Sequence, residues 1–289
     1  MNVITHSGKF HADDVLAYAL LRHFHPLRNQ MALTRTRDPQ IIERADIVFD
    51  VGGIYDPTSG RFDHHQNEYT GPLSSAGMVL AWLIESNWID TELGQRLHHD
   101  IVEYVDDVDN GRVEERANVP CFSRMVSLFT ASANTLIEFD QQFHKAVSIA
   151  SGIIEGVEAK YNLDKQAKQF VLTAMNGPRE FSNIIEFPQY LSWKGTYYAH
   201  GGETHPTEFV MYPTMYETWQ VSAIPPTIDS FAQKRSFPES WAGLRDEELS
   251  AVTGTASIFC HKNRFIAVFK TKKDAIDAMK HFGLIVSST

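Results

Sequence analysis

The sequence predicts an α/β protein: a first domain with a parallel sheet and flanking helices, then a smaller α+β domain. Two observations support the parallel sheet. Short apolar strands alternate with helical segments, and polar residues follow where those strands end. A third observation supports the second domain, because strand patterns replace helical periodicity after residues 175–181. We therefore expect domains at 1–170 and 171–289.

The first elements alternate as a parallel sheet requires. Strands are predicted at 2–5, 31–36 and 46–53, and helices at 12–24 and 39–45. The strands are short apolar or alternating runs, and the first helix has apolar residues at helical spacing. The second helix begins with an aspartate N-cap and a proline in its first turn. Ligands of such sheets bind beyond the carboxyl ends of the strands.

Helical patterns continue to about residue 175, and strands dominate afterwards. Helices are predicted at 74–88, within 93–111 and across 136–175. The second domain is predicted to hold a series of strands and a closing helix, at 183–187, 207–213, 218–224, 256–261, 265–270 and 272–282.

The composition is that of a soluble globular protein. Of 289 residues, 43% are apolar and 21% are charged, which suffices for a core. No apolar run approaches the ~20 residues of a membrane helix, and the N-terminus lacks a signal-peptide pattern. Two cysteines make no disulfide framework. We expect no membrane association and a cytoplasmic location.

Negative charge is concentrated in the first half. Residues 1–160 hold 13 Lys/Arg and 23 Asp/Glu, whereas residues 161–289 hold 13 of each. This distribution argues against non-specific coating of nucleic acid, which needs a basic surface. A phosphate-bearing partner would have to be attracted by metal ions or by a local basic patch. One such patch follows Thr255, with six Lys/Arg against two Asp/Glu.

Four segments place imidazoles and carboxylates at the ends of core elements. Such a mixture suits Mn²⁺, Zn²⁺ or Fe²⁺ better than Ca²⁺, which prefers oxygen ligands alone. Four or more carboxylates carry too much charge for one cation, whereas two ions roughly 3.5–4 Å apart would neutralise them. The segments are "HSGKFHADD" (His6, His11, Asp13, Asp14), Asp50, "DHH" (63–65) and "VDDVDNG" (Asp106, Asp107, Asp109).

Each segment alone has an ordinary explanation. A histidine after a strand is usually solvent-facing or hydrogen-bonded in the core, and Asp-Val-Gly-Gly can simply form a turn. The chain also contains "LHHD" (97–100), with the same residue types inside an amphipathic helix. We expect His98 and His99 to be surface residues. The metal hypothesis therefore depends on four segments meeting at one edge of one sheet.

Several motifs resemble the Myg family, a branch of the DHH phosphoesterase superfamily. They are "DVGGIYDP", "RFDHHQ", "SSAG", "VDDVDNG", "TRTRDP" and "FPESWAGLRDEEL", which together span nearly the whole chain. The resemblance implies a first domain that binds two metal ions, usually Mn²⁺, with Mg²⁺, Zn²⁺ or Fe²⁺ as alternatives. It also implies a second domain that closes over the substrate. Myg proteins are described as 3′–5′ exonucleases on RNA, and carry an older label, metal-dependent protein hydrolase.

The resemblance assigns metal ligands residue by residue. His6 matches the first ligand of the superfamily. His11 stands where the superfamily has an aspartate, and Asp13 matches the second aspartate of that pair. Asp50 matches the aspartate that bridges both ions, and His64 matches a further ligand.

The "DHH" and "VDDVDNG" segments supply the remaining roles. The resemblance makes His65 a group that contacts the substrate phosphate, while Asp63 is expected to orient the histidine pair. The last ligand is Asp109 or Asp106, which share a helix face. We favour Asp109 because "DNG" resembles the "DTG" of relatives, and we expect Asp107 to point elsewhere.

The second domain departs more from the superfamily. "GGETHPTEF" (201–209) is similar to a glycine-rich, histidine-bearing motif, which makes His205 a candidate substrate contact. Arg235 and Arg245 are better candidates, because a guanidinium binds phosphate oxygens with two parallel hydrogen bonds. The alternative for Arg245 is an ion pair with a neighbouring carboxylate.

Three functions remain open from the residues. The first is a phosphodiesterase or exonuclease on RNA or short oligonucleotides, in which two metal ions activate water for direct attack. The second is a small-molecule phosphatase or pyrophosphatase with the same ligands. The third is a non-enzymatic metal-binding interaction protein. Phe237, Trp241 and Phe265 are either base-stacking or core residues. The oligomeric state stays open, with a homodimer among the alternatives.

Overall fold

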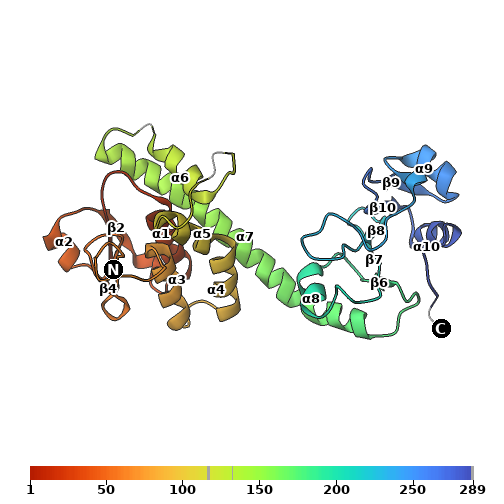
Figure 1. Cartoon of the computed structure of the whole chain (residues 1–289), viewed down its shortest axis with the longest axis horizontal. Coiled ribbons are helices and arrows are strands. Elements are labelled where there is room, and N and C mark those ends of the chain that lie inside the picture. The colour runs from red at the N-terminus through yellow and green to blue at the C-terminus, as the bar shows by residue number, and fades with distance from the viewer. Residues whose placement is uncertain (116–117, 132, 288–289) are drawn as a thin grey trace. The chain divides into compact units, whose positions relative to one another are not determined.

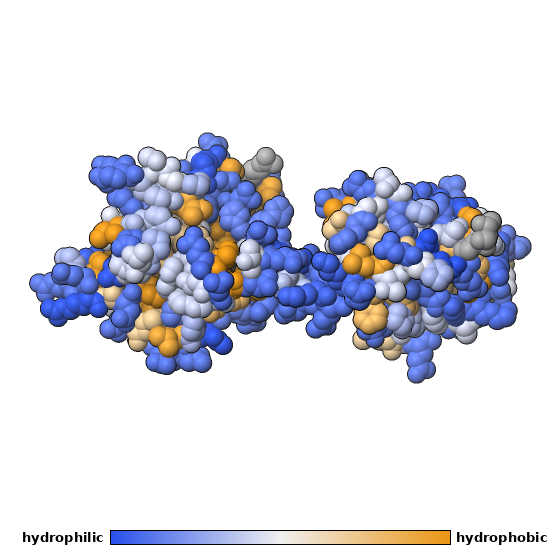
Figure 2. Space-filling model, turned by 90° about the horizontal axis from the view of Figure 1, so that it is seen from below, coloured by the Kyte–Doolittle hydropathy of each residue, from blue (hydrophilic) through white to orange (hydrophobic). Residues whose placement is uncertain are grey.

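The computed structural model describes residues 1–115, 118–131 and 133–287. The chain divides into two compact units, Met1–Ala159 and Lys160–Thr289 (Figure 1). Each unit has its own five-stranded sheet. The surface is mostly hydrophilic, with apolar residues gathered in small patches on both units (Figure 2). No helix within the described ranges is long and apolar enough to cross a membrane.

The sheet of the first unit confirms a mixed α/β protein with a parallel sheet. Its strands run in the order β2-β1-β3-β5-β4. The first four are mutually parallel, and β4 pairs antiparallel with β5 at one edge. The parallel strands therefore end at the same edge. The strands are β1 (Asn2–Thr5), β2 (Ala32–Arg35), β3 (Ile47–Phe49), β4 (Tyr55–Asp56) and β5 (Arg61–Phe62).

Helices cover this sheet, and α1 is held in place by its packing against the other helices. Helix α1 packs against α3, α5 and α6, and its apolar residues from Val15 to Leu21 are buried. Burial of each large apolar side chain stabilises the fold by roughly 1.5–3 kcal/mol. The helices are α1 (Ala12–Phe24), α2 (Pro39–Glu43), α3 (Ser75–Glu85), α4 (Thr91–Leu97), α5 (Glu103–Asp109), α6 (Phe122–Thr130) and α7 (Leu136–Asn176).

The second unit holds a mostly antiparallel sheet in the order β6-β7-β8-β10-β9. Only β6 and β7 are parallel neighbours. One apolar cluster includes Phe237 and Trp241, and the other includes Tyr197 with residues of α7. The elements are β6 (Ile184–Glu186), α8 (Lys194–Ala199), β7 (Phe209–Pro213), β8 (Trp219–Ala223), α9 (Asp246–Thr253), β9 (Ser257–Cys260), β10 (Ile266–Phe269) and α10 (Lys272–His281).

Some local structure departs from the sequence-based expectations. The helical stretch within 93–111 is interrupted by a π-helical turn at His98–Val102. Helices α6, α8 and α9 were not predicted, because six to nine residues show too little periodicity to stand out. Phe237 and Trp241 are at most 1% exposed, so they are core residues and cannot stack on a ligand.

Candidate metal centre

The first strand delivers His6 into a buried acidic environment. β1 ends at Thr5, and the next residue, His6, is only 4% exposed. Its Nε2 atom lies 3.2 Å from Asp14 Oδ2 and 3.1 Å from Asp50 Oδ2. A ring nitrogen between two carboxylates is suited either to carry a proton or to bind a cation.

Asp14 belongs to the "HSGKFHADD" segment of candidate polar residues, but the family resemblance assigned it no ligand role. Its Oδ1 accepts a hydrogen bond of 3.0 Å from the backbone N–H of His11, at the start of α1. Its Oδ2 faces His6. The carboxylate thus ties the helix N-terminus to the end of β1. The available signal was its place in the first helical turn, where an acidic side chain can turn back onto the cap.

Asp50 occupies a strained turn directly after β3. Its φ angle is 54°, in the left-handed region that non-glycine residues rarely adopt. The backbone N–H of Asp50 donates to Phe62 O at 3.1 Å, and Gly52 follows with φ 100°. Strain of this kind costs about 1–3 kcal/mol and persists where the surrounding structure enforces it. The turn aims the two carboxylate oxygens of Asp50 in different directions.

Asp50 contacts histidines on both sides. Its Oδ2 lies near His6, while its Oδ1 is 3.7 Å from His64 Nε2 and 3.5 Å from His65 Nδ1. Neither of the longer distances is a hydrogen bond. They leave space beside Oδ1 for a further positively charged group.

The three residues of the "DHH" segment, which follows β5, make different contacts. Asp63 is buried, and its Oδ2 accepts a 2.6 Å hydrogen bond from Gly53 N–H. Its Oδ1 accepts from the backbone N–H of His65 at 3.1 Å and pairs with His65 Nδ1 at 2.8 Å. His64 turns inward, with Nε2 3.1 Å from Asp109 Oδ2 and 3.8 Å from Asp13 Oδ2. His65 remains 64% exposed.

The structure separates Asp109 from Asp106. Asp109 lies against His64, whereas Asp106 is 2% exposed and held by α3. Asp106 Oδ1 accepts from Ser74 N–H at 3.0 Å, Ser74 Oγ at 2.6 Å and Gly77 N–H at 3.2 Å. Its carboxylate joins α5 to the start of α3 instead of joining the cluster. Asp107 points elsewhere, as expected, and pairs with Arg112.

Three groups of ligand atoms form among the described residues, each within 4.8 Å of one another. They are His6, Asp14 and Asp50; then Asp50, His64 and His65; then His11, Asp13 and Asp109. Asp106 belongs to none of them. Asp50 belongs to two groups, which is the arrangement expected of a carboxylate shared between two cations.

The buried imidazoles and carboxylates shift one another's pKa values. Burial alone would lower the pKa of His6, but Asp14 and Asp50 raise it to about 10. Burial likewise opposes the charged form of His64, yet Asp109 and Asp50 raise its pKa to about 10. Burial disfavours ionised Asp50, but the neighbouring His6 and His64 side chains lower its pKa to about 2. Burial and the charges of Asp50 and Asp109 raise the pKa of Asp13.

The cluster fits a bound divalent cation. Both carboxylate oxygens of Asp13 are buried and have no hydrogen-bond partner among the described residues. An unpartnered buried carboxylate is costly unless a cation compensates it. The donors are imidazole nitrogens and carboxylate oxygens, a set that suits Mn²⁺, Zn²⁺ or Fe²⁺. Beside His11 and Asp109 lies a cavity of about 220 Å³, also lined by Lys9, Ser123 and Ser127.

The other predicted site residues lie in the second unit and contact their own neighbours. His205 uses both ring nitrogens, with Nδ1 2.8 Å from Thr207 Oγ1 and Nε2 3.1 Å from Met175 O. Arg235 pairs with Glu208 at 3.3 Å and donates to Gly283 O at 2.7 Å. Both side chains therefore have partners within the second unit.

Arg245 and His98 have surroundings that the sequence did not predict. The Arg245 guanidinium lies 4.7 Å from the centre of the Phe259 ring, and no ion pair with a carboxylate is found for it among the described residues. The His99 side chain is 83% exposed, as expected of a surface residue. His98 is half-buried, and its charge favours the ionised form of Asp106, which burial disfavours.

Comparisons with known proteins place the chain among relatives along nearly its full length. Residues 2–281 match the family described as "MYG1_exonuc: Uncharacterised protein family (UPF0160)". The MYG1 protein of Chlamydia trachomatis is 36% identical over 283 residues, covering 96% of this chain and 95% of that protein. The MYG1 exonuclease of Homo sapiens is 31% identical over 313 residues, covering 94% and 83%.

A solved structure adds little. RecJ from Thermus thermophilus, in complex with Mn²⁺, matches with 11% identity and a TM-score of 0.29. The match covers 100% of this chain and 53% of RecJ, so the chain spans about half the length of that protein. A score this low supports no inference about the site.

Replacing Gly77 by alanine should destabilise the protein. A Cβ at this position would collide with the Asp106 carboxylate, and overpacking of this kind costs about 1–3 kcal/mol. Gly156→Ala is the matched control, because Gly156 also lies in a helix but meets only open space. There the substitution should stabilise by about 0.5–1 kcal/mol. Denaturant unfolding measures both, and equal effects would contradict the Asp106 contact.

Loading the protein with Mn²⁺ at neutral pH should release protons. With pKa values raised to about 10, His6 and His64 are protonated without metal and must lose protons to become ligands. Titration calorimetry in two buffers of different ionisation enthalpy reports this release. His99→Ala should behave like the parent protein, whereas Asp50→Asn should weaken metal binding. Heats that do not depend on the buffer would argue against these two ligands.

Proposed function

The chain belongs to the MYG1_exonuc family (UPF0160), and from that premise we propose a metal-dependent phosphodiesterase. More specifically, we infer a 3′–5′ exonuclease that acts on RNA or short oligonucleotides. Relatives from human, rat and mouse are named MYG1 exonuclease. Residues 1–170 would form the catalytic domain and residues 171–289 the substrate-binding domain.

One observation carries this proposal: Asp50 takes part in two of the three ligand groups. A single carboxylate between His6 on one side and His64 with His65 on the other supports a pair of divalent cations, Mn²⁺ being our first choice. The remaining ligands would be His11, Asp13 and Asp109. When bound, the ions would supply positive charge for phosphate oxygens and lower the pKa of a bound water.

The chain's own residues would orient the phosphate. His65 is exposed next to buried Asp50, and Asp63 fixes the direction of its ring through Nδ1. The other ring nitrogen, Nε2, is then available to donate to a phosphoryl oxygen when the ring is protonated. Asp63 would act as a positioning residue, because it also holds the Gly53 turn that follows Asp50.

The reaction class is direct hydrolysis. The oxygen of water forms a bond to phosphorus and releases one proton to solvent, while the bond to the leaving oxygen breaks and that oxygen takes up a proton from solvent. No nucleophilic serine or cysteine is required. The two cysteines lie outside the cluster.

A small-molecule phosphatase or pyrophosphatase is the second candidate. The cavity beside His11 and Asp109 has a volume of about 220 Å³, below the ~300–1,000 Å³ typical of pockets for drug-sized ligands. A space of this size favours a single phosphate or a small part of a longer substrate. The two candidates share the ligand set and differ in which substrates are cleaved.

A substrate panel distinguishes the candidates. Protein loaded with Mn²⁺ is offered labelled RNA, single-stranded DNA, a dinucleotide and pyrophosphate. We expect shortening of RNA from its 3′ end, read on a denaturing gel. Cleavage of pyrophosphate alone would overturn the nuclease proposal in favour of the second candidate. Metal binding without any turnover would instead favour an interaction protein.

Substitutions at the cluster should reduce activity in a graded order. Asp50→Asn should abolish detectable turnover, because it removes the charge shared by both ions. His65→Ala should lower kcat by roughly 10²–10³, as loss of a charge-stabilising donor does. Asp63→Asn should cost roughly 10–100-fold, typical of a group that orients another. Initial rates on RNA measure the series, with His99→Ala as an unaffected control. A loss for His99→Ala equal to that of Asp50→Asn would refute this assignment.

A further inference from the structure

The second unit contains a cavity of about 480 Å³ that the proposed chemistry does not use. Its walls come from the end of β8, the loop 225–233, the turn before β10 and the start of α8. They include Pro225, Ile228, Phe231, Phe265, Lys194 and Asn263. Apolar walls, two aromatic rings, the amides of Gln233 and Asn263, the Lys194 ammonium group and the Asp229 carboxylate are thus gathered around a single space.

Phe231 is the outstanding residue of this cavity. It is 99% exposed, and its neighbour Ile228 is 47% exposed. A phenyl group left in water forgoes roughly 1.5–3 kcal/mol of burial energy. Exposed aromatic side chains beside a cavity mark surfaces that bind a ligand or partner.

The loop that carries Phe231 is firmly anchored at both ends. Tyr198 Oη donates a 2.6 Å hydrogen bond to Pro225 O, and Lys234 N–H donates to Ile224 O at 2.8 Å. Lys234 Nζ also donates to Gly202 O at 2.5 Å and His205 O at 2.8 Å. Phe231 is therefore exposed on a loop whose two ends are held by hydrogen bonds. The "GGETHP" segment, which the sequence marked as a candidate substrate contact, supports that loop.

The other walls carry groups that match a nucleotide. The Phe265 ring is half-buried and lies 4.3 Å from the His261 ring, centre to centre. Asn263 presents an exposed amide, and Lys194 an exposed ammonium group. An aromatic ring stacks on any base, an amide can bond a base edge, and an ammonium group pairs with phosphate.

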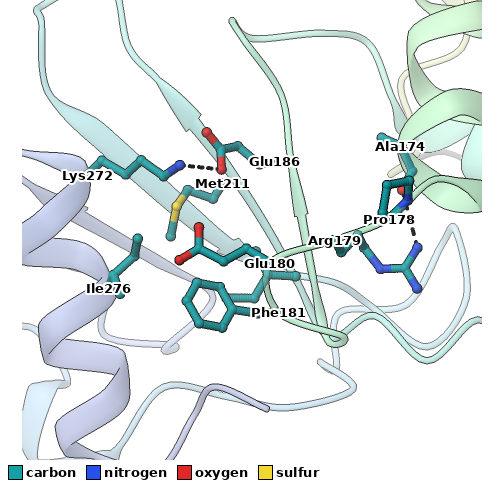
Figure 3. A pocket seen from close by; sticks show the side chains of 10 residues that line it. Ala174, Pro178, Arg179, Glu180, Phe181, Glu186, Met211, Lys272 and Ile276 are labelled. Carbon is teal, nitrogen blue, oxygen red and sulfur yellow. Dashed lines mark hydrogen bonds and ion pairs between the residues drawn. The ribbon is translucent and has the colours of Figure 1, made fainter. Parts of the chain in front are cut away.

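A second cavity of the same unit lacks this character (Figure 3). Its volume is about 150 Å³, and its two basic side chains already have partners. Lys272 pairs with Glu186 at 2.6 Å, and Arg179 donates to backbone carbonyls such as Met175 O at 2.6 Å. These side chains are committed to the fold, so this cavity offers no free recognition group of comparable kind.

From this comparison we propose that the cavity at Phe231 is a base-stacking subsite for a single-stranded oligonucleotide. Phe231 would stack on one base, with Phe265 forming the opposite apolar wall, while Lys194 would pair with a neighbouring phosphate. The lining favours a nucleotide as the occupant, because aromatic rings, amides and the Lys194 ammonium group surround one space, beside the carboxylate of Asp229. The inference rests on the proposed function and extends it, since nucleobase contacts distinguish oligonucleotides from pyrophosphate.

Binding measured without turnover tests the subsite. The background is full-length Asp50→Asn protein, and the probe is a fluorescently labelled eight-nucleotide RNA followed by anisotropy. Adding Phe231→Ala should weaken binding about 10-fold, the lower part of the range for one stacked base. Phe231→Trp should restore the affinity. Tyr216→Ala removes another exposed aromatic residue, 79% exposed in the β7–β8 turn, and should change nothing.

An abasic oligomer of the same length separates base stacking from other contacts. It should bind the parent and the Phe231→Ala protein equally, because it has no base to stack. If Phe231→Ala binds the intact RNA as tightly as the parent does, the subsite is overturned whatever the substrate panel shows. An equal loss for the abasic oligomer would overturn it as well, and would indicate an apolar partner. Failure of the panel with an intact Phe231 effect would instead refute catalysis alone.

Discussion

The compensation of buried negative charge is the constraint on which the first unit depends. Asp13 and Asp14 are fully buried, and Asp50 nearly so. Three carboxylates this close cannot all remain ionised without cations, because burial and mutual repulsion both favour protonation. In the metal-free state the protonated rings of His6 and His64 supply the positive charge. A divalent ion would supply more positive charge in the same place. The same residues can therefore hold either protons or a metal ion.

The scaffold serves this constraint through its strand ends. β1, β3 and β5 are parallel neighbours, so His6, Asp50 and the "DHH" segment leave the sheet at one edge. The strained φ of Asp50 lets one carboxylate face two histidines, which an extended residue there would not achieve. Asp106 fixes α5 to α3 through three hydrogen bonds and thereby places Asp109 at the cluster. Both helices depend on a small residue at Gly77.

Sequence patterns predicted those features that local chemistry determines. His6 and Asp50 were predictable because polar residues at the ends of apolar strands stand out from their surroundings. Helical spacing alone could not separate Asp106 from Asp109, since they share a helix face and the deciding partner, Ser74, lies 32 residues from Asp106. The preference for Asp109 came from the family resemblance. The capping spacing could have marked Asp14 as a residue that turns back onto the helix start, but its contact with His6 depends on where β1 ends beside that helix. Short helices such as α8 were not predicted from the sequence, because they contain too few residues to show a helical period.

The "GGETHP" segment holds the loop that carries the proposed Phe231 subsite, because Gly202 O and His205 O accept hydrogen bonds from Lys234. Burial lowers the pKa of Lys234, and its ammonium group is nevertheless held by backbone carbonyls of Gly202 and His205. Anchoring a loop with a partly desolvated lysine is costly compared with an apolar side chain. Rigidity offsets that cost where the loop must present an aromatic ring to water, because a preorganised surface loses less entropy on binding. Under our proposal the segment serves the neighbouring Phe231 surface by holding its loop, while both ring nitrogens of His205 contact Thr207 and Met175.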